Sequence, residues 1–238
     1  NSSYAEKISN FKIDVTIEQS GELSIVETIA YDFEQQNKHG IFRDIPSSVK
    51  KDEIIKDLGL YQFSVQIDGD IVEWKKSTYR SKQAGDTVRL KIGSANKYVT
   101  GKHYYKIAYR VEKGVLPSAQ NEHDDAIRWN IIGTGWNVSI SNIEANFYLP
   151  TSLSQHDIAL FTFTGAYGSK SSAASSKWIA PRHLQVKVAR LNAHEGATVE
   201  LGYPADILDQ SGLDNMSPTL MDWFLGNFHW AALIGFLL

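Results

Sequence analysis

Apolar and polar residues alternate with a period of two along most of the chain, the pattern of a strand with one buried face. Clear examples are FKIDVTI at 11–17, YQFSVQI at 61–67 and HYYKIAYRV at 103–111. Many such short runs are separated by turn-rich gaps. The pattern predicts an all-β fold, an antiparallel β-sandwich of the immunoglobulin-like or jelly-roll-like kind, with a barrel as the alternative.

One segment has helical spacing instead. Within residues 47–58, serines stand where a helix cap would be, Ile54, Ile55 and Leu58 are spaced for one face, and Gly59 follows as a stop signal. We therefore expect one short helix here.

Composition excludes several classes of function. The 238 residues carry 24 Lys and Arg against 27 Asp and Glu, a net charge of −3, which argues against a nucleic-acid partner. The absence of cysteine excludes a disulfide scaffold, a thiol nucleophile and a thiolate metal site. His123-Asp124-Asp125 is the densest ligand-like cluster, and its polar surroundings indicate a solvated loop. No catalytic motif is recognisable, so we expect no metal, no cofactor and no enzyme activity.

The two ends of the chain suggest a membrane protein. Residues 223–238 (WFLGNFHWAALIGFLL) contain no formally charged residue, and a bilayer span takes about 20 apolar residues. We expect residues 219–238 to be the start of a truncated transmembrane helix, the alternative being a short apolar helix that docks on the domain. Residues 206–218 then read as a linker that follows a domain at 1–205. That domain could also consist of two subdomains, divided near 113–126. The chain begins without Met, after either a signal peptide or a removed tag.

One ionisable residue interrupts an apolar strand face. Glu27 falls in phase with Leu23, Ile25, Ile29, Tyr31 and Phe33. A buried carboxylate must be paired or protonated, and the planar guanidinium of Arg43, in GIFRDIP at 40–46, suits a bidentate pair. We predict a Glu27–Arg43 pair that fastens residues 40–46 onto the sheet. Two alternatives stay open: Glu27 reaches water at a strand end or bulge, or it acts as an acid or base.

Two tryptophans flank a glycine-rich turn in WNIIGTGW at 129–136. Trp129 is in phase with Ile127 and Ile131, which favours a place in the core. Trp136 follows the turn, and either a core position or an exposed stacking surface for a sugar fits its pattern. Arg43 and Trp136 are therefore the candidate binding residues, while Glu27, Gly40, Trp129 and Gly133 are the candidate structural ones.

Several ordered segments together resemble one family. They are residues 11–33, HGIFRDIP at 39–46, residues 88–111, residues 124–150 and FTFTGAYGS at 161–169. Their order resembles the N-terminal domain of the predicted bacterial membrane proteins grouped as domain of unknown function 2207, over roughly residues 8–203. GIFRDIP followed by RWNIIGTGW is its most specific part. The recurrent positions of the family match six residues of this chain: Glu27, Gly40, Arg43, Trp129, Gly133 and Trp136.

The resemblance implies a signal peptide, an extracytoplasmic β domain and transmembrane helices, and it implies no activity. We therefore expect a non-catalytic domain for sensing or protein interaction, tethered to the cell membrane on its extracytoplasmic side, with an unidentified protein partner. A carbohydrate-binding or carbohydrate-active envelope domain is the first alternative; its catalytic form would need a groove with Trp136 exposed and two nearby carboxylates. A structural spacer in a membrane complex is the second.

Overall fold

The computed structural model describes residues 5–51, 54–81, 85–121 and 124–217, and these form a nearly all-β fold. The largest sheet has eight strands, in the spatial order β15 (Ala174–Ala180), β16 (His183–Leu191), β13 (Ser139–Tyr148), β1 (Lys7–Ile17), β2 (Leu23–Asp32), β10 (Lys102–Val111), β6 (Leu60–Ile67) and β7 (Asp70–Ile71). The predicted all-β class is therefore confirmed.

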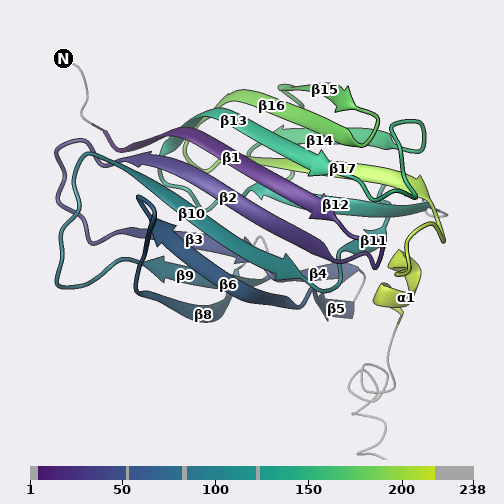
Figure 1. The fold of residues 1–238 in the computed structure, drawn as a ribbon, viewed down its shortest axis with the longest axis horizontal. Coiled ribbons are helices and arrows are strands. Elements are labelled where there is room, and N and C mark those ends of the chain that lie inside the picture. Colours follow the sequence, from purple (N-terminus) through teal and green to yellow (C-terminus); the bar gives the residue numbers. More distant parts are fainter. Residues whose placement is uncertain (1–4, 52–53, 82–84, 122–123, 218–238) are drawn as a thin grey trace, which may run out of the picture.

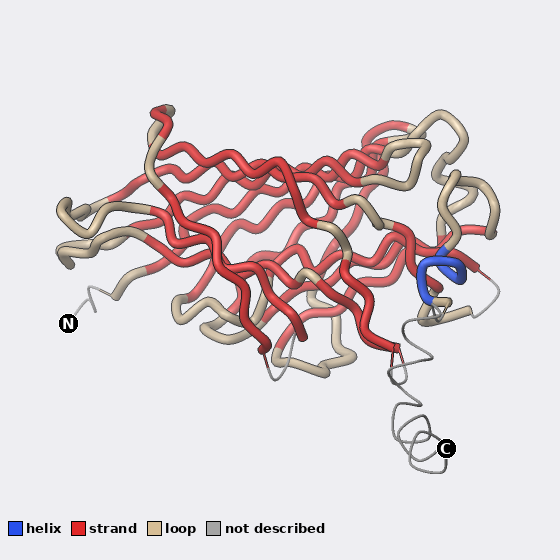
Figure 2. The backbone as a smooth tube through the Cα atoms, turned by 90° about the horizontal axis from the view of Figure 1, so that it is seen from below, coloured by secondary structure: helices blue, strands red, loops and turns tan. Residues whose placement is uncertain are grey.

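Three smaller sheets complete the fold. One has the order β11 (Val115–Pro117), β12 (Asp124–Ile132), β17 (Gly196–Pro204) and β14 (Ala159–Gly165). A second has the order β3 (Ile41–Pro46), β9 (Gly85–Ile92) and β8 (Trp74–Ser81), and a third pairs β4 (Ser48–Lys51) with β5 (Ile54–Asp57). Figures 1 and 2 show the eight-stranded sheet as one layer, with the three-stranded and four-stranded sheets beside each other in a second layer.

The buried faces of the strands meet between these layers. A single hydrophobic cluster draws residues from both, from Ile8 in β1 to Leu208 after β17. The face of β2 that the sequence predicts as apolar is buried, since Leu23, Ile25 and Ile29 are fully inaccessible. Burial of side chains from every large sheet in one cluster fixes how the sheets sit on one another.

The eight-stranded sheet is not antiparallel throughout. β1 and β13 are parallel neighbours, with Phe11 opposite Ile143 and Val15 opposite Phe147, whereas β1 and β2 are antiparallel. A parallel pair requires a long crossover connection, and here the chain between β1 and β13 passes through the second layer before it returns. Strands on both sides of residues 113–126 therefore share one sheet.

The helix predicted at 47–58 is wrong. This segment forms the β4–β5 hairpin, in which Val49 pairs with Lys56 and Lys50 with Ile55. Apolar residues over such a short stretch fit a helical and an extended period equally well, and branching at the β-carbon of valine and isoleucine favours the strand.

Residues 206–217 lie against the body of the domain. They include α1 (Gly212–Met216), whose first backbone N–H donates to Asp125 Oδ1 at 2.9 Å, and Met216 and Leu208 are buried. Among the described residues no helix has the length and apolarity needed to cross a bilayer. The apolar helix predicted at 219–238 lies outside the described residues.

Candidate functional site

A buried ion pair joins the two layers. Glu27 of β2 and Arg43 of β3 are both buried, and Arg43 Nε and Nη2 donate to Glu27 Oε2 and Oε1, each at 2.7 Å. Tyr109 of β10 donates its hydroxyl to Glu27 Oε1 at 2.8 Å. The predicted pair is thus confirmed, with a third partner that the sequence did not reveal. It fixes β3 to the eight-stranded sheet.

The charges within this network favour the ionised pair. Burial opposes the charge on Arg43, but the carboxylate of Glu27 outweighs it and raises the pKa of the guanidinium. Burial and the negative charge of Glu27 raise the pKa of the Tyr109 phenol well above its usual value. Arg43 therefore stays charged while Tyr109 stays a neutral donor.

The next residue of β3 points the opposite way, as strand geometry requires. Asp44 accepts from Arg89 Nε and Nη2 at 2.7 Å each, and its Oδ2 accepts from the Tyr79 hydroxyl at 2.9 Å. Burial alone would raise the pKa of Asp44, but the hydrogen bonds from Arg89 and Tyr79 outweigh it and lower the pKa. The Asp44 carboxylate is therefore ionised and fixed on the outer face of β3.

β3 faces the turn at residues 133–135, which follows β12. A Cβ placed on Gly133 would lie 3.8 Å from Asp44 O, and one on Gly135 would lie 3.4 Å from Asp44 Oδ2. We call this line of approach between the three-stranded and four-stranded sheets the seam. A cavity opens on each side of it, and Asp44, Gly133 and Gly135 line both cavities.

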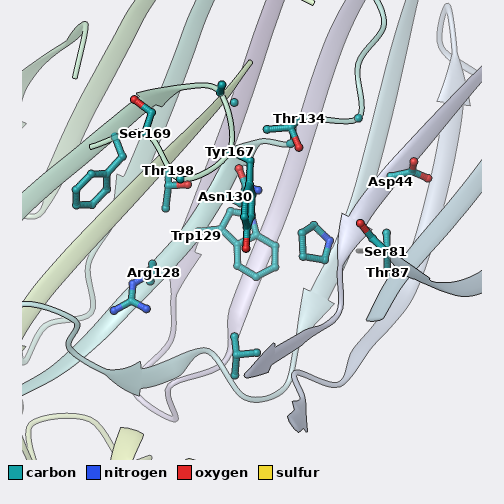
Figure 3. Close-up of a pocket in the computed structure, with 18 of the residues that line it drawn as sticks. Asp44, Ser81, Thr87, Arg128, Trp129, Asn130, Thr134, Tyr167, Ser169 and Thr198 are labelled. Atoms are coloured by element: carbon teal, nitrogen blue, oxygen red, sulfur yellow. The ribbon is translucent and has the colours of Figure 1, made fainter. Parts of the chain in front are cut away.

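The first cavity has a volume of about 460 Å³ and lies between the three-stranded and four-stranded sheets. Figure 3 shows Tyr167 in front of Trp129, with Asp44, Ser81 and Thr87 toward one side and Thr198 and Ser169 toward the other. Trp129 is buried in the hydrophobic cluster, as its phase predicts, and its ring stands 6.3 Å from that of Tyr109. The cavity therefore rests on the same buried core that holds the Glu27–Arg43 pair.

The lining of the first cavity combines aromatic rings with hydroxyl groups. Tyr167 belongs to the loop after β14 and is 65% exposed. Tyr79 belongs to β8 and lines the cavity from the three-stranded sheet. The serine and threonine residues come from seven separate positions on the three smaller sheets and their loops: Ser48, Ser81, Thr87, Thr134, Thr164, Ser169 and Thr198. Large apolar rings beside convergent polar groups are typical of small-molecule sites.

The second cavity has a volume of about 510 Å³ and lies on the other side of the seam. Its lining includes Glu6, whose carboxylate accepts from Lys38 Nζ and from the Tyr31 hydroxyl, both at 2.7 Å. Trp136 lines it too but is only 7% exposed, and its ring packs edge-on against Phe11 at 6.3 Å. Trp136 therefore offers little free surface for stacking.

The residues singled out from the sequence converge on the seam. Arg43, Gly40, Gly133 and Trp136 line the second cavity, Trp129 and Gly133 line the first, and Glu27 lies beneath.

Gly40 has a backbone requirement. Its φ is 125°, and a Cβ there would lie 1.9 Å from Ile92 O, so only glycine lets β3 begin this close to β9.

Four residues of the site were missed by sequence reasoning: Asp44, Tyr79, Arg89 and Tyr167. Asp44 and Tyr167 stand within GIFRDIP and GAYGS, segments that carried the family resemblance, and this was a usable signal. Tyr79 and Arg89 lie in strands whose pattern resembles that of any exposed strand. Their side chains meet only because of the strand register, which places Arg89 of β9 between Ser77 of β8 and Asp44 of β3.

Few acidic side chains line the seam. Among the described residues that line the first cavity, Asp44 is the one carboxylate, and Arg89 neutralises it. A paired-acid glycosidase needs two carboxyl groups about 5–10 Å apart on either side of the bond. In the described part of the chain, no three His, Asp or Glu side chains cluster in a way that could hold a metal ion.

Comparison with known proteins places the fold without assigning an activity. An uncharacterized protein of Escherichia coli K12, YciQ, is 28% identical over 137 residues, which cover 56% of this chain and 20% of YciQ. The structure of yeast LTA4 hydrolase aligns with 85% of this chain and 30% of its own, at 11% identity and a TM-score of 0.50. An M1 zinc metallopeptidase from Deinococcus radiodurans aligns with 82% of this chain and 42% of its own, at 10% identity and a TM-score of 0.44.

The 11% identity to yeast LTA4 hydrolase speaks for the fold alone, and the chain spans less than half the length of each of these three proteins. The family described as "Predicted membrane protein (DUF2207) N-terminal domain" matches residues 7–203, which is most of the chain. This chain therefore belongs to the family of N-terminal domains of predicted membrane proteins that carries the label domain of unknown function 2207.

Proposed function

We propose that this chain is the non-catalytic, ligand-binding ectodomain of a membrane-anchored protein, displayed on the extracytoplasmic side, and that its ligand or partner occupies the first cavity. The observation that carries the proposal is the first cavity itself, an aromatic and hydroxyl-lined space, one wall of which belongs to a sheet that a buried ion pair fixes to the core. A site that is formed before its ligand arrives loses less conformational entropy on binding.

The electrostatics of the seam support binding rather than acid–base catalysis. A general acid must hold a proton near neutral pH, and the pKa of Asp44 is lowered, not raised. Its two oxygens also accept hydrogen bonds from Arg89 and Tyr79, which keep the carboxylate in one orientation. A fixed, ionised carboxylate serves well as a hydrogen-bond acceptor for a ligand.

The extracytoplasmic placement is supported by the family, whose members are predicted membrane proteins, and by the apolar sequence at 223–238. The chain contains no cysteine, so single cysteines can report which side it faces. Ser175 of β15 is exposed and lies outside both cavities. A membrane-impermeant maleimide added to intact cells should label Ser175→Cys of the membrane-anchored protein. Labelling only after cell lysis would place the domain in the cytoplasm and overturn this part of the proposal.

Occupancy of the first cavity can be measured with the same chemistry. Tyr167 at its entrance and Tyr98, outside both cavities, are exposed to similar extents, 65% and 69%. We expect Tyr167→Cys to react with maleimide more slowly in the native envelope than after purification, while Tyr98→Cys reacts at one rate in both. Equal rates for Tyr167→Cys in the two settings would mean that nothing occupies the cavity in the cell.

A further inference from the structure

We propose that the ligand of the first cavity is a neutral glycan, a chain of uncharged sugar residues that enters beside Tyr167 and extends over Gly133 toward the second cavity. This inference rests on the proposed binding function and adds the chemical class of the ligand. It is argued from the charges, the rings and the glycine positions of the two cavities.

The charged groups indicate a neutral ligand. Every charged side chain that lines either cavity already has an oppositely charged partner within the protein. The pairs are Asp44 with Arg89, Arg128 with Glu200, Glu6 with Lys38 and Arg43 with Glu27, each at 2.7 Å. An anionic or cationic ligand would have to compete with these pairs, whereas a neutral ligand needs only hydrogen-bond donors and acceptors from them.

The aromatic rings indicate sugar rings as the neutral groups. Tyr167 is 65% exposed at the cavity entrance, and Tyr79 is 38% exposed on the side of β8. A sugar ring has an apolar C–H face and a rim of hydroxyl groups. The tyrosine rings can cover such a face, while hydroxyl groups at the partly exposed positions Ser169 and Thr198 can meet the rim.

The seam also disfavours a peptide that would add to β3 as a further strand. At the middle of β3, Asp44 O accepts a hydrogen bond from Arg43 Nη1 and faces Gly133. This carbonyl is therefore already used where an added strand would need it.

Gly133 shows where the ligand would cross from one cavity to the other. Its φ lies outside the left-handed range, and a Cβ there would meet nothing closer than 3.8 Å, so the fold does not require glycine. Because Gly133 lines both cavities, an added methyl group would occupy space that the two share. Gly133 therefore marks the place where the two cavities come closest to each other.

Calorimetric titration of the 238-residue chain with hexasaccharides tests the class of ligand. The probes are neutral hexamers of glucose, mannose, galactose and N-acetylglucosamine, with a galacturonic acid hexamer as the anionic comparison. We expect saturable binding of at least one neutral hexamer and weaker or no binding of the anionic one. Binding of the anionic hexamer alone, or of none of the five, would overturn the inference.

Matched variants place the binding at the cavity. Tyr167→Ala should weaken the neutral hexamer about tenfold because a stacking ring is lost, while Tyr98→Ala, at equal exposure outside the cavities, should leave affinity within about twofold. Gly133→Ala should also weaken binding, and Gly202→Ala, where a Cβ has similar room away from both cavities, should not. Circular dichroism confirms that each variant is folded. An unchanged affinity in both Tyr167→Ala and Gly133→Ala would contradict the inference.

The two proposals fail in different ways. If Tyr167→Cys is protected in the native envelope but no neutral hexamer binds, the glycan inference is wrong and the binding function stands. If Tyr167→Cys is unprotected and no hexamer binds, both are wrong.

Discussion

Arg43 reaches from the three-stranded sheet across the core and donates two hydrogen bonds of 2.7 Å to Glu27 of the eight-stranded sheet. Both side chains are buried, so the pair is shielded from solvent and its geometry is fixed. Asp44, the neighbour of Arg43 in β3, lines both cavities. The same few residues therefore hold the layers together and set the position of one wall of the candidate site.

Loss of either partner should cost substantial stability. We expect Glu27→Gln and Arg43→Gln each to lower the free energy of unfolding by about 3–5 kcal/mol, because the remaining buried charge loses its partner. The double variant should lose less than the sum, with a coupling energy of about 1–3 kcal/mol in urea unfolding.

The exposed pair Arg80–Asp86 offers the control for this cycle. Its coupling energy should be clearly the smaller of the two, since solvent screens the exposed pair. Additive losses at Glu27 and Arg43 would argue against a direct interaction between them.

Acid should weaken the outer face of β3 through Asp44. Its folded pKa is lowered from the unfolded value of about 3.9, so its contribution to stability is present above that pH and is lost as the pH falls through the folded pKa. In Asp44→Asn the free energy of unfolding should be lower at pH 7, and the part of its decrease in acid that comes from Asp44 should disappear. The check is urea unfolding at pH 7 and at pH 3.

Asp86→Asn is the matched comparison, because Asp86 also accepts from an arginine but its side chain is more exposed, 40% against 18% for Asp44. Its effect on the pH dependence should be the smaller of the two. A larger effect at Asp86 than at Asp44 would show that burial does not set the strength of these pairs.

Alkaline titration should separate the tyrosines into two groups. Burial raises the pKa most strongly in four of the eleven, namely Tyr31, Tyr105, Tyr109 and Tyr203. These should stay neutral in the folded protein above pH 10, where they ionise in the unfolded chain, so stability falls as the pH rises from there. Phenolate absorbance should rise in two steps, the second coinciding with loss of circular dichroism. A single step while the fold persists would be inconsistent with their burial.

Two glycines should respond to alanine in opposite ways. A Cβ on Gly212 would lie 2.2 Å from the backbone of Leu116, so Gly212→Ala should force α1 away from β11. Gly133→Ala has room for its methyl group and should be neutral, or stabilise by about 0.4–1 kcal/mol because the unfolded chain is restricted. Hydrogen exchange across 206–217 reports the first effect and urea unfolding the second. Unchanged exchange in Gly212→Ala would show that α1 does not need this close contact.

The sequence predicted features that depend on neighbouring residues better than features that depend on distant ones. The period of two located the strands, and Glu27 in an apolar row predicted a partner because a buried charge cannot stand alone. The β4–β5 hairpin was mistaken for a helix, since four-residue strands are too short to show their period. Residues 206–218 read as a linker because Pro, Gly and Asp signal a turn in any context. The packing of the described part, 206–217, depends on Asp125 and Leu116, far away in the chain.

The cavities could not be predicted from the sequence, for a related reason. Their lining comes from strands and turns on two sheets, and the sequence does not state which sheets lie side by side. Tyr167 illustrates this, because its exposure at a cavity entrance depends on where the loop after β14 lies relative to β3. The burial of Trp136 likewise depends on Phe11 and Tyr31 of the other layer.

The buried pair fixes the three-stranded sheet to the eight-stranded sheet, and this holds one wall of the first cavity at a set distance from the four-stranded sheet before a ligand arrives. Spin labels on Ser77→Cys of β8 and Ala159→Cys of β14, both exposed and on opposite sides of the seam, allow electron–electron double resonance to measure that spacing. The account predicts one narrow distance distribution in the otherwise unchanged chain and a broadened one when Glu27→Gln is added to a protein that still folds. Equal distributions in the two proteins would contradict it.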